Sequence, residues 1–168
     1  MDEIDQQILT MLQENARVSN AEIAREVGMV PSGISDRIRR LEERGLITGY
    51  SAQIDPKGMG LGLLAYIFVV SDEPFGETPT AEGLAELPEV LEVHHIAGED
   101  CYLAKVRVSD TNALADLMRN KLAAIPNIKN TRTTIVLETL KESARLPLGS
   151  ETNPTGETEP QTATNGTG

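Results

Sequence analysis

Apolar residues recur at helical spacing three times within the first 45 residues of the chain. The first run contains Ile4, Ile8 and Leu12, and it follows Asp2, a residue that favours the N-cap of a helix. Two further runs follow in order, formed by Ile23, Ala24 and Val27, and then by Ile34, Ile38 and Leu41. The pattern predicts three short helices that share one small core, and we place this domain at residues 1–50.

The second and third predicted helices are joined by residues that are typical of a tight turn. Ser19 and Glu22 have the spacing of a capping box at a helix start. Gly28 suits the position at the end of a helix where the backbone adopts a left-handed conformation. Pro31 suits the first turn of the next helix. Such a pair is typical of a helix-turn-helix, whose second helix enters the major groove of DNA. An ordinary amphipathic pair with a solvated charged face stays open as the alternative.

One face of the third predicted helix suits contact with DNA. When Ile34 and Leu41 point inward, a helical wheel turns a polar set outward. The residues that point most nearly outward are Ser32, Asp36, Arg39 and Glu43, and those beside them are Gly33, Ser35 and Arg40. All of these except Glu43 are expected to contact DNA. Small residues at the start of the helix allow a close approach to base edges, and the arginines suit guanine edges or phosphates.

The second half of the chain alternates strand-like and helix-like segments. The predicted strands are residues 63–70, 90–97, 102–108 and 129–140, and the predicted helices are residues 80–87 and 110–125. This βαββαβ order predicts a ferredoxin-like sandwich over residues 63–142, so the fold class is α+β. The two helices cover one sheet face, and the apolar residues of the other face need a second subunit. We therefore expect at least a homodimer.

Two further segments flank the predicted sandwich. Residues 47–54 alternate apolar and polar positions, which predicts a strand, and with the turn at 55–58 they make residues 51–62 a linker of strand and turn. From Gly149 onward the chain has no Lys, Arg or large apolar residue. We expect residues 143–168 to form a disordered acidic tail with a solubilising role, and a partner-binding role is the alternative.

The net charge of −11 weighs against binding to nucleic acid. Residues 1–50 hold six arginines and nine acids, whereas residues 51–168 hold nine basic and 17 acidic residues. Most of the excess acid therefore lies outside the predicted helix-turn-helix. One copy carries little positive charge, so we expect two or more copies to bind DNA together.

The composition also limits other classes of protein. No apolar run reaches membrane-spanning length, and the chain opens on acid rather than on a basic signal-peptide region, so we expect a cytoplasmic protein with no membrane partner. The single cysteine, Cys101, excludes a disulfide framework within the chain and a cysteine-based zinc cluster. His94 and His95 are neighbours on a predicted strand and point to opposite faces. We expect no metal and no cofactor, with His95 packed beside Leu91 and Val93 and His94 more exposed.

Short motifs run through the first domain at characteristic spacings. They are, in order, Asp2-x-x-Asp5-x-x-Ile8-Leu9, Ala16-Arg17, Glu22-Ile23-Ala24, Gly28, Arg37-Ile38-x-x-Leu41-Glu42, Gly45-x-Ile47-x-Gly49-Tyr50 and Asp55-Pro56. Together they resemble the Lrp/AsnC family of feast/famine transcriptional regulators, over about residues 1 to 142. The resemblance implies a winged helix-turn-helix that binds specific double-stranded DNA. It also implies a second domain that dimerises, assembles further into tetramers or octamers, and binds a small effector, often an amino acid.

The resemblance also assigns site residues. The stretch from Pro31 to Arg40 matches the recognition helix of the family, which adds Pro31 and Arg37 to the DNA-contacting set. The implied effector-binding residues are Gly98, Glu99, Asp100, Cys101 and Tyr102, joined by Thr131, Thr133 and Thr134. An acid beside an exposed glycine backbone suits the ammonium and carboxylate groups of an amino acid, although a hairpin turn with solvated acids remains the alternative. Val30 departs from the family pattern, which usually has Ser or Thr as the helix cap.

The leading hypothesis is a ligand-responsive transcriptional regulator without enzymatic activity. One alternative is a DNA-independent metabolite-sensing oligomer that acts through protein partners, which the acidic net charge favours. The other is an enzyme similar to certain tetrapyrrole decarboxylases, which resemble this family in architecture.

Overall fold

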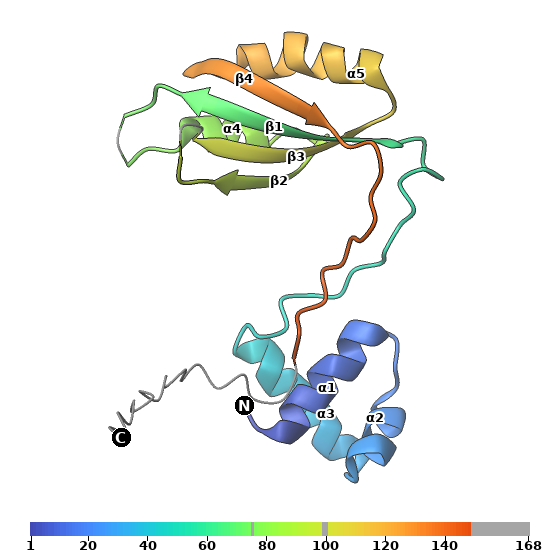
Figure 1. The fold of residues 1–168 in the computed structure, drawn as a ribbon. Coiled ribbons are helices and arrows are strands. Elements are labelled where there is room, and N and C mark those ends of the chain that lie inside the picture. Colours follow the sequence, from blue (N-terminus) through green and yellow to red (C-terminus); the bar gives the residue numbers. More distant parts are fainter. Residues whose placement is uncertain (75, 99–100, 149–168) are drawn as a thin grey trace, which may run out of the picture. The chain divides into compact units, whose positions relative to one another are not determined.

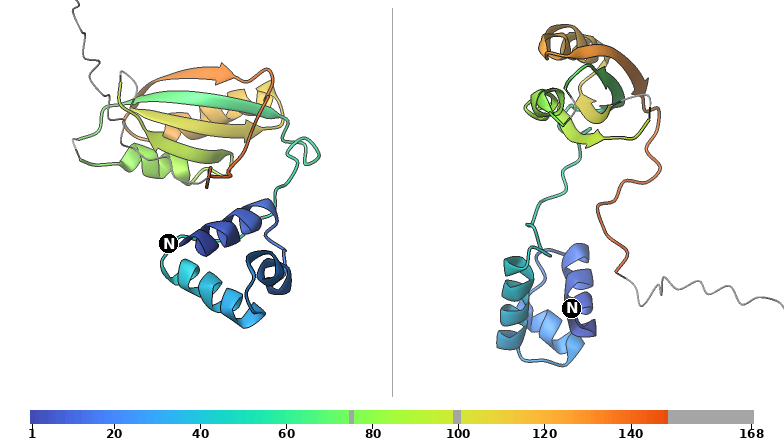
Figure 2. Two further views of the ribbon diagram at one scale, coloured as in Figure 1. Left: turned by 60° about the horizontal axis from the view of Figure 1, so that its bottom comes forward. Right: turned by 90° about the vertical axis from the view of Figure 1, so that its left-hand side faces the viewer.

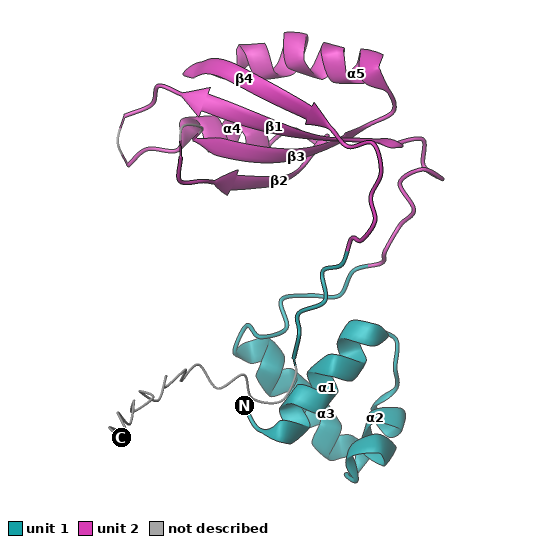
Figure 3. Cartoon of the chain, in the orientation of Figure 1, with its two compact units in different colours: residues 1–51, 143–168 teal, residues 52–142 magenta. Residues whose placement is uncertain are grey.

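The computed structural model describes residues 1–74, 76–98 and 101–148, and the chain forms two compact units (Figure 1, Figure 3). Unit 1 contains residues 1–51 together with the described residues from 143 onward, and unit 2 contains residues 52–142. Within the described ranges, no helix is both long enough and apolar enough to cross a lipid bilayer.

Unit 1 is a bundle of three helices, α1 (Glu3–Glu14), α2 (Asn20–Val27) and α3 (Pro31–Glu43). Its buried core residues are Ile8, Ile23, Ala24, Ile34 and Leu41, which confirms the three predicted helices. The capping box of Ser19 and Glu22 begins α2, and Gly28 closes it with a φ of 70°. A second capping box, formed by Asp2 and Asp5, begins α1, where the sequence predicted only a cap.

Unit 2 is an antiparallel sheet with helices on one face (Figure 2). Its elements are β1 (Leu63–Ser71), α4 (Pro79–Ala85), β2 (Val90–His95), β3 (Tyr102–Val108), α5 (Thr111–Asp116) and β4 (Ile128–Ile135). The strand order is β2-β3-β1-β4, which is the predicted ferredoxin-like order. Fully buried residues such as Ile67, Val106 and Leu84 form the core between the sheet and the helices.

The predicted helix at 110–125 is not uniform. After α5 it widens into a π-helical turn, η1 (Leu117–Lys121), and ends in a 3-10 turn, η2 (Leu122–Ala124). Leu117 and Leu122 are each 2% exposed. A π-helical turn holds more residues than an α-helical turn, so these two leucines, five positions apart, come to nearly the same side.

Residues 47–54 form no strand, in contrast to the prediction. Tyr50 and Ile54 keep 51% and 69% of their surface exposed. A strand needs a neighbour for its backbone N–H and C=O groups, and no described segment pairs with this one. The alternating pattern made the segment suitable for a strand but did not supply a partner.

β4 ends at Ile135, well before the predicted end at Leu140. Residues 136–142 instead run over the helix-free face of the sheet, where they line a groove of about 360 Å³ with Leu64, Tyr66 and Lys105. At its end, the Glu142 carboxylate accepts hydrogen bonds from Lys105 Nζ at 2.6 Å and from Arg107 Nη2 at 2.9 Å. The chain thus covers part of the face for which a second subunit was expected.

Residues 143–148 contact α1, whereas the sequence predicted a disordered tail from residue 143. The Leu146 N–H donates to Gln13 Oε1 at 2.7 Å, and Gln13 Nε2 donates to the Leu146 carbonyl at 3.2 Å. Arg145 donates to the Glu14 carbonyl at 3.4 Å. The remainder of the predicted tail, residues 149–168, lies outside the described residues.

Candidate nucleic-acid interface and ligand loop

α3 presents a polar outer face because its apolar side packs on α1 and α2. Ile34 and Leu41 are 0% and 1% exposed. The exposed members of the predicted DNA-contacting set are Pro31, Ser32, Ser35, Asp36, Arg39 and Arg40. Gly33 is half-buried, and a Cβ atom at this position would lie 2.9 Å from Met29 Cε. A small residue therefore fits where α3 begins beside the turn.

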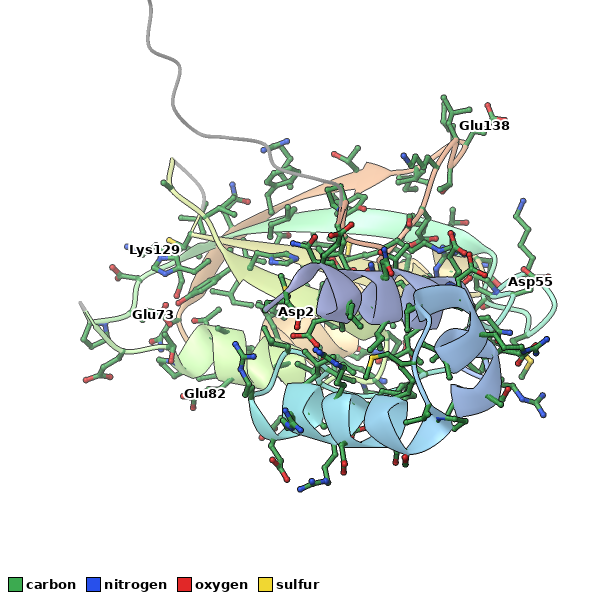
Figure 4. All side chains as sticks on the ribbon, turned by 90° about the horizontal axis from the view of Figure 1, so that it is seen from below. Asp2, Asp55, Glu73, Glu82, Lys129 and Glu138 are labelled. Atoms are coloured by element: carbon green, nitrogen blue, oxygen red, sulfur yellow. The ribbon has the colours of Figure 1, made fainter. Side chains whose placement is uncertain are left out.

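Arg37 is turned toward α1 rather than outward. Its Nη1 atom lies 2.8 Å from Asp2 Oδ2 and 2.7 Å from Asp5 Oδ1, and the Arg37 side chain is 24% exposed. Figure 4 labels Asp2 at the start of α1, on the side that faces α3. Hydrogen bonds from the Asp5 backbone and from Arg37 hold the pKa of the Asp2 carboxyl below its ordinary value. Arg37 thus fixes α3 to the capping box of α1, and its expected contact with DNA stays a prediction.

The other two arginines of the predicted set differ in their partners. Arg39 lies between Asp36, at 3.3 Å, and Glu43, at 3.1 Å, and all three side chains are well exposed. Exposed pairs of this kind are weak, so a phosphate can compete for the guanidinium. Arg40 is exposed and has no ion pair or hydrogen bond within the part of the chain that the structure describes.

The predicted effector loop is only partly described. Gly98 has a φ of 148°, a backbone conformation that favours glycine, whereas Glu99 and Asp100 lie outside the described residues. Cys101 is half-buried, and its backbone N–H donates to the Val69 carbonyl at 2.9 Å. Its Sγ atom accepts from the Ser71 N–H at 3.4 Å and donates to the Ser71 carbonyl at 3.6 Å. The end of the loop is therefore anchored to the end of β1.

Tyr102 points into unit 2 rather than toward the surface. It is 1% exposed, and its hydroxyl donates to the Glu73 carboxylate, which also accepts from the Thr80 N–H at 3.1 Å. The bond to Glu73, together with burial, raises the pKa of Tyr102 to about 12. Burial raises the pKa of Glu73, but the hydrogen bonds from Tyr102 and Thr80 outweigh it, so the net shift is downward. Figure 4 labels Glu73, which lies beside the start of α4.

Glu73 is a residue that the sequence interpretation missed. Its position shortly after a predicted strand and directly before Pro74 was the available signal, but an acid in such a place is usually solvated. The contact that gives Glu73 its role comes from Tyr102, which is 29 positions away in the chain.

The three threonines of the predicted effector set do not share one face. Thr131 pairs with Val69, which pairs on its other side with Tyr102, so Thr131 lies in the same row of the sheet as the end of the loop. Thr133 pairs with the buried Ile67, and its hydroxyl donates to Met118 Sδ at 3.5 Å. Thr134 pairs with Tyr66, so it lies on the helix-free face. The geometry thus groups Thr131 with Cys101 and Tyr102 and places Thr134 on the opposite face.

The two histidines lie on opposite faces of β2, as predicted, since they pair with neighbouring residues Leu103 and Tyr102 of β3. The prediction that His95 is packed is wrong, because His95 is exposed, with its ring centroid 5.1 Å from that of Tyr102. A shift of register between Val90 and Glu92 separates Leu91 from the regular alternation of Val93 and His95, and His95 is the last residue of β2. The described residues contain no group of three or more His, Cys, Asp or Glu side chains arranged to hold a metal.

Comparison with known proteins agrees with this division into two units. Residues 1–48 match the family model of winged helix-turn-helix DNA-binding domains, and residues 76–146 match that of the Lrp/AsnC ligand binding domain. The leucine-responsive regulatory protein of Escherichia coli strain K12 is 36% identical over 150 residues, which cover 87% of this chain and 90% of that protein. The chain belongs to the Lrp/AsnC family.

Solved structures of two other regulators have the same fold as this Lrp/AsnC protein. A transcriptional regulator of Neisseria meningitidis in complex with L-methionine matches with a TM-score of 0.81 and 30% identity, over 88% of this chain and 97% of the other. The feast or famine regulatory protein of M. tuberculosis, complexed with L-methionine, matches with a TM-score of 0.80 and 32% identity, over 86% and 97% of the two chains. The relatives are transcriptional regulators and not enzymes, so the alternative of a tetrapyrrole decarboxylase is rejected.

Proposed function

We propose that this protein is a transcriptional regulator that binds specific double-stranded DNA through α3, and that an amino acid bound near residues 98–102 alters this binding. The observation that carries the proposal is the outer face of α3, where Arg39 and Arg40 are exposed on a helix-turn-helix of a DNA-binding family. Arginine at such positions contacts guanine edges or phosphates.

The proposed effector site consists of residues 98–102 and the end of the sheet where Cys101 and Tyr102 contact β1. Thr131 lies in the same row as Tyr102, and Cys101 is held to Val69. In this site Glu99 or Asp100 would accept the ammonium group, and Gly98 would offer its backbone to the carboxylate. The Tyr102 hydroxyl is engaged by Glu73, so Tyr102 would shape the site rather than bind the effector through its hydroxyl. The two relatives solved with L-methionine support an amino acid as the class of ligand.

We further propose that the working form contains at least two copies of the chain. The net charge of −11 and the single unpaired Arg40 on the outer face of α3 give one described copy little attraction for DNA. Two copies double the number of phosphate contacts and fix the spacing of two half-sites.

The direct experiment selects duplexes from a random library with the full-length protein and then titrates the best duplex by fluorescence anisotropy, with and without each amino acid. The proposal expects a preferred duplex and at least one amino acid that changes its Kd by about fivefold or more. The matched double variant Glu99→Gln with Asp100→Asn removes both candidate acceptors of the ammonium group, so it should bind the duplex as the wild type does and lose the response. If an amino acid stabilises the protein but no selected duplex binds more tightly than random DNA, the result would instead support the hypothesis of a DNA-independent metabolite sensor.

A further inference from the structure

Val30 occupies the N-cap of α3 without capping it. Its backbone is extended, with a φ of −91° and a ψ of 146°, and its side chain makes no hydrogen bond to the helix start. The Val30 carbonyl accepts from the N–H groups of Gly33 at 3.0 Å and Ile34 at 3.3 Å, so the helix begins here nonetheless. Ser, Thr, Asp and Asn are the residues that stabilise this position, and valine is among the least favourable.

The Val30 side chain is also unprotected from solvent. It is 64% exposed, although apolar side chains of this size are usually buried. It is followed by the exposed Pro31, and its Cγ2 atom lies 3.7 Å from the position that a Cβ of Gly33 would take. Valine at this position therefore gives the helix no cap and contributes little to the core of unit 1.

We propose that Val30 determines part of the DNA specificity by contacting the 5-methyl group of a thymine in the major groove. This inference rests on the proposed function. The N-terminal residues of a recognition helix are those that reach base edges. Among the groups that base pairs present in the major groove, the thymine methyl is the apolar one, and apolar side chains recognise it. An exposed branched apolar side chain at the start of α3 is complementary to that group, whereas a capping hydroxyl is not.

The test uses the duplex selected with the full-length protein. Each thymine is replaced in turn by deoxyuridine, which removes the methyl group and leaves the base pair intact. For the wild type we expect one thymine in each half-site whose replacement raises the Kd by about fourfold. This is the change in Kd that corresponds to the burial of one methyl group away from water. For Val30→Ser the same replacement should leave the Kd unchanged, and for Val30→Ala, which keeps only the Cβ methyl group, its effect should be smaller than for the wild type.

The two variants separate the contact from the stability of the helix. Val30→Ser restores a capping hydroxyl and should raise the melting temperature, so a loss of thymine preference cannot be assigned to unfolding. Val30→Ala removes the apolar branches without adding a hydroxyl that could bind a base. Met59→Ser is the control, because Met59 is also an exposed apolar residue but belongs to unit 2. In this variant each deoxyuridine replacement should change the Kd as it does for the wild type.

Three outcomes overturn the inference. The first is a selected duplex in which no thymine responds to replacement in the wild type. The second is a responding thymine whose replacement weakens binding by Val30→Ser and by Val30→Ala as much as it weakens binding by the wild type, because another residue would then contact the methyl group. The third is a failure to select any duplex, which would contradict the proposed function itself and is recognised by the absence of binding before any thymine is changed.

Discussion

The two units treat their basic side chains in opposite ways. In unit 2, Lys105 and Arg107 are each 12% exposed beneath Glu142, and Lys121 and Lys129 pair with Glu89 and Asp72. In unit 1, Arg37 is committed to Asp2 and Asp5, but Arg40 is exposed and unpaired within the described residues. Four basic groups of the sheet domain are thus paired with acids of that domain, whereas Arg40 leaves an unpaired positive charge on the outer face of α3.

This contrast explains how a chain with a net charge of −11 can still bind DNA. Association with DNA depends on the groups that meet the phosphates and displace their counterions, and not on the net charge of the whole chain. The acidic remainder limits non-specific binding, because like charges repel where no specific contact compensates. The same contrast separates two kinds of arginine on α3, one structural and one free to bind.

The largest effect on the folded state is expected from Arg37→Ala. Asp5, whose side chain is 13% exposed, would lose its charged partner, and we expect the free energy of unfolding to fall by about 2 kcal/mol. Urea unfolding followed by circular dichroism measures this loss. The control is Arg39→Ala, which removes pairs that are exposed to solvent and should change stability little. Equal losses in the two variants would mean that Arg37 does not hold α3 to α1.

A smaller effect, confined to unit 2, is expected from Tyr102→Phe. The hydrogen bond to the ionised Glu73 carboxylate should contribute about 1.5 kcal/mol to the free energy of unfolding. Because the pKa of Tyr102 is raised to about 12 in the folded state, this contribution is complete below the ordinary tyrosine pKa of about 10 and is lost as the pH rises through 12.

Urea unfolding of the wild type and Tyr102→Phe at a series of alkaline pH values measures that change. The difference between the two proteins should be constant up to about pH 9 and should shrink toward pH 12. Tyr66→Phe is the matched control, because the Tyr66 hydroxyl makes no hydrogen bond among the described residues. A difference between wild type and Tyr102→Phe that stayed constant across this range would contradict the proposed bond.

The sequence predicted those parts of the fold that depend on local pattern. The helices of unit 1 follow from apolar spacing with capping residues such as Ser19 and Gly28, and the order of unit 2 follows from its alternating elements. The prediction from sequence failed for segments whose structure depends on contacts with residues far away in the chain. Residues 47–54 have a strand pattern without a neighbouring strand, and residues 136–142 leave the sheet to reach Lys105 and Arg107.

The same limit applies to the candidate sites. A helical wheel cannot show that Arg37 pairs with Asp2 and Asp5, because these residues are more than 30 positions away. Nor can it show that Glu73 holds the Tyr102 hydroxyl, or that Thr133 and Thr134 lie on opposite faces of the sheet. The residue types in both sites were predictable, whereas the sorting of these residues into structural and binding roles required the fold.

The measurement that tests the central claim most directly is the salt dependence of duplex binding by the wild type and by Arg40→Ala. If Arg40 meets a phosphate from the outer face of α3, the slope of log Kd against log salt should decrease in magnitude by about one for each bound copy of the chain. Arg107→Ala, which changes a paired arginine of unit 2, should leave the slope unchanged. Identical slopes for the wild type and Arg40→Ala, with no change in the preferred duplex sequence, would contradict the account.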